Sequence, residues 1–196
     1  MVSCILLSAG LSSRFGSPKA LALINHVTVI ERTQKALIDS SVDEIIIVLG
    51  SESKRIKPYI LKHKKVKVVY NKDYNLGQTS SFKIGLNFVN SDAKGVMLFP
   101  VDFPLVKSET LDSLINKFYL QNPGILIPSY RDRKGHPPIF NAKFKNEFLS
   151  LSDDQGLNLI QHQYSKDVFL FEVIDSGVIR TFNTLEELDK INHVAI

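Results

Sequence analysis

Short apolar runs, rich in β-branched and aromatic residues, are the feature that most constrains the fold of this chain. They show little alternation of polar and apolar residues, as expected of strands covered on both faces of a parallel sheet. Between them lie stretches whose apolar residues recur at helical intervals, such as Phe82, Leu86 and Val89. This repeated strand–helix order predicts an α/β domain with a mainly parallel sheet and right-handed crossover connections.

The expected elements alternate along the first two thirds of the chain. Strands are predicted at residues 2–7, 44–49, 66–70, 96–99 and 125–127, and helices at 29–38, 54–62, 80–89 and 110–120. The rhythm then changes, because four breaking residues follow: Pro128, Gly135, Pro137 and Pro138. We expect added strands at 138–140 and 168–173, which form a small antiparallel excursion, and a last helix at 184–191.

Length and composition indicate one ordinary globular domain over residues 1–196. The chain is 44% hydrophobic and 22% charged, with a net charge of +4. Part of that charge lies in the basic run 62–67, which is typical of a solvated face; aromatic residues do not interleave with it, so no nucleic-acid partner is expected. No apolar run reaches the length of a membrane span, and the first is too short for a secretion signal, so we expect a cytoplasmic protein.

The single cysteine, Cys4, excludes an intramolecular disulfide and a cysteine-based metal cluster. It lies within the first apolar run, which favours a buried small residue over a nucleophile.

The first expected strand leads directly into a loop of small residues that ends in a lysine, Ser8-Ala9-Gly10-Leu11-Ser12-Ser13-Arg14-Phe15-Gly16-Ser17-Pro18-Lys19. Small residues let the backbone approach a ligand and turn its N–H groups inward. Arg14 and Lys19 supply the positive charge that a triphosphate needs. The spacing fits neither of the two common nucleotide fingerprints, G-x-x-x-x-G-K-[ST] and G-x-G-x-x-G. The loop therefore predicts phosphate binding, with a plain strand-to-helix turn as the alternative.

An acidic residue follows another expected strand. Asp102 lies in Phe99-Pro100-Val101-Asp102-Phe103-Pro104, at the carboxyl end of the strand over residues 96–99. Ligands of open α/β sheets bind at this end of the strands, and carboxylate oxygens are hard ligands that suit Mg²⁺. Asp102 is thus a candidate metal ligand, with a turn residue before proline as the alternative.

Four further polar segments are candidates for binding. Gln78-Thr79-Ser80-Ser81 opens an expected helix, where it either caps the helix or forms an anion or nucleobase site. His136 stands between a glycine and two prolines, and on its own is more typical of a structural or surface histidine than of a catalytic one. Asp154 and Asn183 each precede an expected helix, so helix capping is the alternative to ligand binding.

In this order, the segments resemble the NTP-transferase family that makes molybdenum-cofactor dinucleotides, and most of all its molybdopterin cytidylyltransferase branch. Each motif is modest in specificity, but the ordered set is specific and spans residues 7–187. The matching residues are Leu7-Ser8-Ala9-Gly10, Ser13-Arg14, Gly16, Lys19, Gly77-Gln78, Ser80-Ser81, Gly85-Leu86, Asp102-Phe103-Pro104, Gly135-His136-Pro137, Asp154-Gln155-Gly156, Asn183-Thr184 and Glu186-Glu187.

The resemblance implies a Rossmann-like, three-layer sheet flanked by helices, with the nucleotide at the carboxyl ends of the strands. It assigns nucleotide binding to Leu7, Ser8, Ala9, Gly10, Gln78, Ser80 and Ser81. It assigns catalysis to Lys19, Arg14 and Asp102, Mg²⁺ binding to Asp102 and Asn183, and acceptor binding to His136 and Asp154.

The implied reaction transfers CMP from CTP to the terminal phosphate of a molybdopterin-type acceptor and releases pyrophosphate. Because that phosphate is already an anion, no general base is required. Ala9 resembles the cytidylyl branch, whereas the guanylyl branch tends to have glycine there. A client molybdoenzyme is a further implied partner.

The chain departs from the family pattern at three places. Ser8 replaces the more usual alanine. Leu185 stands where a proline usually follows the Asn-Thr or Asp-Thr pair of the family. Leu157-Asn158 replaces the common Ala-Arg, which removes a cation and leaves acceptor recognition open. Two alternatives therefore stay open: a cytidylyl- or uridylyltransferase acting on a sugar or alditol phosphate, and a non-catalytic cofactor-binding chaperone.

Overall fold

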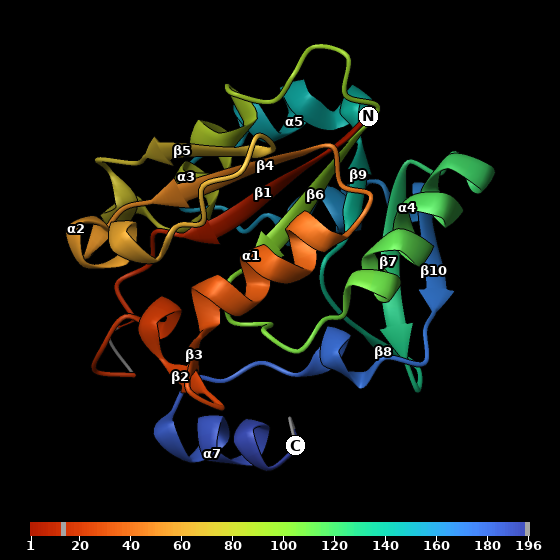
Figure 1. Cartoon of the computed structure of the whole chain (residues 1–196). Helices are drawn as coiled ribbons and strands as arrows, with labels where there is room; N and C mark the ends of the chain where they lie inside the picture. Colours follow the sequence, from red (N-terminus) through yellow and green to blue (C-terminus); the bar gives the residue numbers. More distant parts are fainter. Residues whose placement is uncertain (13–14, 195–196) are drawn as a thin grey trace.

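A mainly parallel sheet forms the centre of the protein in a computed structural model that describes residues 1–12 and 15–194 (Figure 1). The strand order is β10-β7-β9-β6-β1-β4-β5, with β8 paired to β7. The strands are β1 Val2–Ser8, β4 Glu44–Leu49, β5 Val66–Tyr70, β6 Gly95–Pro100, β7 Ile125–Tyr130, β8 Arg133–Lys134, β9 Ile139–Asn141 and β10 Val168–Glu172.

Strand β1 lies at the topological switch point of the sheet, where the strands that follow it are added on both sides. It pairs in parallel with β4 on one side and β6 on the other, and β4 pairs in parallel with β5. The register sets Ser8 beside Leu49 and Leu7 beside Pro100, so the carboxyl ends of these strands meet at one edge. A crevice at such a switch point is where open α/β sheets bind their ligands.

Helices cover both faces of the sheet, as Figure 1 shows. Helices α1 Val29–Asp39 and α4 Ser108–Gln121 pack on one face; α3 Gln78–Leu86, α5 Lys145–Ser150 and α6 Asn158–Gln163 pack on the other. Side chains of β1 alternate between the two resulting cores, with Cys4 and Leu6 in the first and Ile5 and Leu7 in the second. The expected three-layer α/β fold is confirmed.

Cys4 is fully buried, and burial raises the pKa of its thiol far above the ordinary value, as expected of a structural cysteine.

Proline shortens the helix that the sequence predicts at residues 54–62. Helix α2 spans only Ser53–Ile56 and is followed by a 3-10 turn at Lys57–Tyr59. Pro58 has no backbone N–H and its ring obstructs the preceding turn, so the α-helix cannot continue through it.

One of the two added strands runs opposite to the expectation. Strand β9 is antiparallel to both β6 and β7, as expected, but β10 pairs in parallel with β7. Between β9 and β10 the chain passes through α5 and α6, and such a long crossover is what a parallel strand requires.

A short hairpin precedes α1 and was not predicted. Its strands are β2 Leu23–Ile24 and β3 Val27–Thr28, and the two turn residues, Asn25 and His26, have φ angles of 49° and 65°. Two positive φ values are typical of the tight primed turn that matches strand twist. The last helix, α7 Leu185–Val194, packs beside this hairpin (Figure 1).

Helix α3 lies unusually close to the sheet. A Cβ atom on Gly85 would lie 2.6 Å from Cγ2 of Ile5 and 3.2 Å from Cγ2 of Val48, so only glycine permits this approach. The contact brings the amino end of α3, with Gln78 and Ser81, to the edge where β1 and β4 end.

The basic run 62–67 has structural tasks in addition to its solvated surface. Lys65 Nζ donates to the carbonyl oxygens of Ile38 and Ser40 at the end of α1, and Lys67 pairs with Glu44.

Within residues 1–12 and 15–194, no helix combines the length and the apolar character needed to span a bilayer.

Candidate active site

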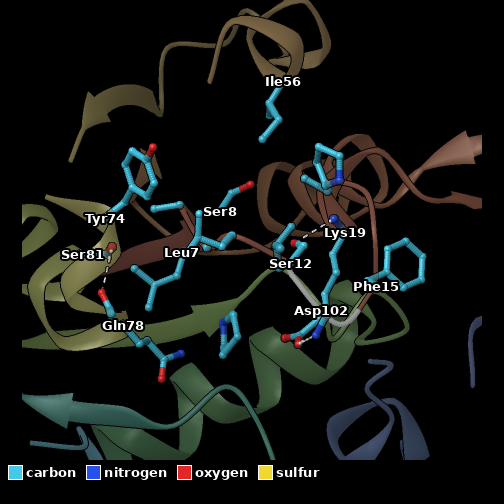
Figure 2. Close-up of a pocket in the computed structure, with 18 of the residues that line it drawn as sticks. Leu7, Ser8, Ser12, Phe15, Lys19, Ile56, Tyr74, Gln78, Ser81 and Asp102 are labelled. Carbon is cyan, nitrogen blue, oxygen red and sulfur yellow. Dashed lines mark hydrogen bonds and ion pairs between the residues drawn. The ribbon is translucent and has the colours of Figure 1, made fainter. Parts of the chain in front are cut away.

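A cavity of about 340 Å³ opens at the carboxyl edge of the sheet, around the end of β1 (Figure 2). Its walls come from the loop after β1, helix α2, the segment after β5, the start of α3, the loop after β6 and the segment before α7. The described residues that line it are Leu7, Ser8, Ala9, Gly10, Leu11, Ser12, Phe15, Pro18, Lys19, Ala20, Ile56, Tyr74, Asn75, Gly77, Gln78, Ser81, Pro100, Val101, Asp102 and Asn183.

Three predicted site residues meet at one end of this cavity. Lys19 Nζ donates to Asp102 Oδ2 at 2.7 Å and to Asn183 Oδ1 at 3.0 Å. The backbone N–H of Lys19 in turn donates to Ser12 Oγ at 3.2 Å, which fixes the end of the loop after β1. Residues separated by 83 and 164 positions thus converge on a single cation.

One aromatic ring faces this cation, and a second ring packs against the first. Lys19 Nζ lies 5.6 Å from the centroid of the Phe182 ring, and Phe15 meets the same ring edge-to-face at 5.3 Å. Apolar neighbours lower the local dielectric and so strengthen the interaction between Lys19 and its oxygen partners. Neither Phe15 nor Phe182 was among the site residues predicted from the sequence.

Asn183 does not act as the helix cap that the sequence left open as an alternative. Thr184 Oγ1 accepts from the backbone N–H of Glu187 and takes that role, while the Asn183 side chain reaches Lys19.

At the start of α3 the N-cap residue is Gly77, and no side chain caps that helix. The capping alternative that the sequence left open for Gln78-Thr79-Ser80-Ser81 is therefore wrong.

Ser81 and Ser80 separate in the structure. Ser81 lines the cavity, whereas Ser80 lies beneath it, where its hydroxyl donates to the carbonyl of Asp73 and accepts from Asn71 Nδ2. Gln78 lines the cavity beside Ser81 (Figure 2). Two of the three α3 residues assigned to the nucleotide are thus placed to contact a ligand directly.

His136 lies behind the cavity rather than in its lining. Its ring packs on Phe103, the residue after Asp102, with centroids 4.5 Å apart, and Nδ1 is buried with no partner among the described residues. Burial lowers the pKa of His136, and the negative charge of Asp102 offsets part of that shift. The imidazole is therefore neutral near pH 7 and close to the predicted metal ligand.

Asp154 is exposed on a loop that packs against α3. Its carboxylate accepts a hydrogen bond from the Ser152 hydroxyl, and the neighbouring Gln155 carbonyl accepts from Thr79 Oγ1 at 2.5 Å. Asp154 is not part of the cavity lining. The other predicted cation, Arg14, lies outside the described residues.

Asp102 and Asn183 suit a divalent cation. Their side-chain oxygens already point at one positive charge, the Lys19 ammonium, and both are hard oxygen ligands. The part of the chain that the structure describes contains no group of three acidic, histidine or cysteine side chains for a metal. Mg²⁺ at nucleotide sites needs only one or two protein oxygens, because phosphate and water supply the rest. The donor set therefore fits.

A cation with two oxygen partners, in a cavity at the switch point of a parallel sheet, defines an α/β nucleotide-binding protein. The chain belongs to the family of the MobA-like NTP transferase domain, whose sequence model matches residues 4–168. It is therefore a nucleotidyltransferase, and the resemblance seen in the sequence is confirmed.

Individual relatives have names that denote different functions. The chain is 26% identical over 186 residues to the molybdenum cofactor cytidylyltransferase of Escherichia coli, with 95% of this chain and 93% of the relative covered. It is 25% identical over 206 residues to the nicotine blue oxidoreductase of Paenarthrobacter nicotinovorans, with 97% and 96% covered.

Solved structures share the same fold. The crystal structure of Rv0371c from Mycobacterium tuberculosis aligns with a TM-score of 0.85 at 24% identity, and the alignment covers 98% of this chain and 97% of that one. A manganese complex of Rv0371c also aligns, with a TM-score of 0.78 at 23% identity and 98% of both chains covered.

Proposed function

We propose that this nucleotidyltransferase transfers CMP from CTP to the terminal phosphate of molybdopterin or the molybdenum cofactor and releases pyrophosphate. The convergence of Lys19, Asp102 and Asn183 on one end of the cavity carries the proposal. It supplies both the positive charge and the oxygen ligands that a metal-bound triphosphate needs. The identity to the E. coli cytidylyltransferase supports this acceptor.

The proposed reaction is balanced and needs no added acid or base. An oxygen of the acceptor phosphate attacks the α-phosphorus of CTP, a new P–O–P bridge forms, and the bond between the α-phosphorus and its bridging oxygen to the β-phosphate breaks. Both electrons of that bond leave with pyrophosphate. The nucleophile is already an anion, so the neutral His136 behind the cavity is not needed as a base.

Lys19 has the central task in this scheme. Its ammonium holds the Asp102 carboxylate and the Asn183 amide oxygen in one place and lies at the cavity wall, where it can turn to phosphate oxygens. Positioning and charge neutralisation are the main contributions of protein groups in this kind of transfer. Arg14, in the same loop, is proposed as a second phosphate contact.

A divalent ion, Mg²⁺ or Mn²⁺, would be held by Asp102 and Asn183 and would neutralise charge on the phosphates. Nucleotidyltransferases of this type use divalent metals, and the related Rv0371c has been solved with manganese. For such an ion to be held by these two oxygens, the Lys19 ammonium would have to move away from them.

The base preference rests on the wall around Ala9. This residue is only 3% exposed and is part of the cavity lining. Its methyl group narrows the cavity compared with the glycine typical of the guanylyl branch, which favours cytosine over guanine.

The decisive experiment follows pyrophosphate release and the dinucleotide product. Purified protein is supplied with Mg²⁺, with CTP or GTP, and with molybdopterin or a sugar or alditol phosphate as acceptor. We expect release only with the pterin acceptor and faster with CTP than with GTP. Release with the sugar phosphate alone would establish the second substrate class. Tight binding of the pterin without any release would establish a cofactor-binding chaperone.

A further inference from the structure

The cavity has two chemically different ends. Lys19, with its partners Asp102 and Asn183, occupies the charged end. Figure 2 shows Tyr74 at the other end, with Gln78 and Ser81 close by. Asp102 follows β6 and Tyr74 follows β5, and three inter-strand spacings separate those strands, or about 14 Å. A ligand whose phosphates bind the charged end therefore presents its uncharged part to the end that Tyr74 lines.

Three adjacent loops build the wall at this uncharged end. Ala9 follows β1, Gly50 follows β4 and Tyr74 follows β5, and Ser51 N donates to the Ala9 carbonyl at 3.1 Å. A Cβ atom on Gly50 would lie 2.6 Å from the Cβ of Tyr74 and 2.9 Å from that of Ala9. The three residues are packed so closely that the wall cannot shift without displacing all of them.

A buried polar network fixes the loop that carries Tyr74. Asn71 is 3% exposed; its Oδ1 accepts from Asp73 N at 2.9 Å, and its Nδ2 donates to the hydroxyls of Ser80 and Ser81 at 2.7 and 3.0 Å. Ser80 Oγ closes the circuit by donating to the carbonyl of Asp73 at 3.0 Å. A buried network in which each polar atom is satisfied holds its segment rigidly.

We propose that Tyr74 is a specificity-determining residue that limits the size of the nucleobase, and that Asn71 is the residue that positions it. This inference rests on the proposed function, because it takes the uncharged part of the ligand to be a base. The phenol ring fills space at the end of the cavity that a purine requires, and its face offers a pyrimidine a surface to stack on. Ala9 is then one part of a wall whose larger part is Tyr74.

The test separates the two ends of the cavity by the choice of ligand. Dissociation constants for CTP, GTP and inorganic tripolyphosphate, all with Mg²⁺, are measured calorimetrically for the wild type and for Tyr74→Ala. We expect Tyr74→Ala to lower the preference for CTP over GTP about tenfold and to leave tripolyphosphate binding within twofold. Tripolyphosphate reports the charged end alone, since it has no base.

Matched variants show whether the ring itself is responsible. Tyr74→Phe keeps the ring and should keep the preference for CTP. Tyr70→Ala removes a tyrosine that is 48% exposed on β5 and outside the cavity, and should also leave the preference unchanged. Asn71→Ala should lower the preference in the same direction as Tyr74→Ala, again without an effect on tripolyphosphate; a general loss of structure would weaken all three ligands together.

The outcomes distinguish this inference from the function on which it rests. An unchanged ratio of CTP to GTP affinity in a folded Tyr74→Ala variant would overturn the role of Tyr74 and leave the transferase proposal intact. An equal loss for all three ligands would also overturn it. Binding of tripolyphosphate but of neither nucleotide by the wild type would reject the nucleotide itself, and with it both proposals.

Discussion

Two lysine–carboxylate pairs lie at opposite edges of the same sheet and have different roles. At the amino edge, Lys67 Nζ meets Glu44 Oε1 at 2.6 Å; at the carboxyl edge, Lys19 Nζ meets Asp102 Oδ2 at 2.7 Å. The distances are nearly equal. The pairs differ in the other hydrogen bonds that each carboxylate accepts.

Glu44 has its acceptor capacity filled by the protein. In addition to Lys67 it accepts from Ser3 Oγ at 2.8 Å and from Asn90 N at 3.1 Å, and the residue is 5% exposed. Among the described residues, Asp102 accepts a single hydrogen bond, from Lys19, and it lines a cavity. A carboxylate with unused lone pairs at a cavity can bind something else, whereas a saturated one stabilises the fold.

The largest expected difference between the pairs is in turnover. Lys19→Met or Asp102→Asn should lower kcat/KM for pyrophosphate release about 100- to 1000-fold, because each removes a group aimed at the phosphates or their metal. Lys67→Met should change it less than twofold. Steady-state kinetics with CTP and the pterin acceptor provide the measurement, with circular dichroism as the check on folding. Full activity in either site variant would contradict the assignment.

For the free energy of unfolding the order of the two pairs should be reversed: the amino-edge pair should matter more than the carboxyl-edge pair. Glu44→Ala leaves the Ser3 hydroxyl and the Asn90 N–H without their shared acceptor and should lower the free energy of unfolding by about 1–3 kcal/mol. Asp102→Ala loses one partly exposed ion pair and should lower it by less than about 1 kcal/mol. Urea denaturation of both variants measures the two costs. Equal losses would show that both pairs are structural.

Metal binding without nucleotide offers a finer test. Because Lys19 holds the oxygens of Asp102 and Asn183, a divalent ion must displace it, and Lys19→Met should tighten Mn²⁺ binding about tenfold. Electron paramagnetic resonance of free Mn²⁺ measures this directly and needs no turnover. Lys67→Met serves as the control for loss of one positive charge. Identical affinities in the wild type and both variants would remove Asp102 and Asn183 as the metal site.

Most of the parallel sheet could be predicted from the sequence, because strands buried on both faces leave continuous apolar runs. Strands β4 and β5 have the predicted bounds without change. The direction of β10 was not predictable in this way, since an apolar run carries no information on which way its partner runs. The stop of α2 was available in the sequence, as Pro58 stands inside the predicted helix.

The site was predictable where charge or an ordered motif marks it, and not elsewhere. Lys19 and Asp102 were both predicted, and the structure adds that they touch. Tyr74 was missed because a loop tyrosine becomes a cavity wall only when three neighbouring strands end together. Ser80 was assigned to the nucleotide from its motif, yet its hydroxyl joins the buried network of Asn71; its direct role stays a prediction.

The smallest expected effect is the acid sensitivity of the amino-edge pair. Burial alone would raise the pKa of Glu44, but hydrogen bonds from Lys67, Asn90 and Ser3 outweigh it and hold the pKa below the ordinary value of 4.5. The stabilisation from this carboxylate is therefore fully present above about pH 4.5. It is lost as the pH falls through the lower value of the folded state, because the unfolded chain binds the proton more readily.

Glu44→Gln should accordingly flatten the loss of stability on acidification, and Lys67→Met should flatten it in part, since it removes one of the donors that lower the pKa. Urea midpoints between about pH 3 and pH 6 measure the slope. Both variants retain the carboxyl-edge pair, so the binding of tripolyphosphate at neutral pH should not change. A wild-type slope in Glu44→Gln would mean that other carboxylates dominate the acid response and that Glu44 stabilises the fold through its geometry rather than through its charge.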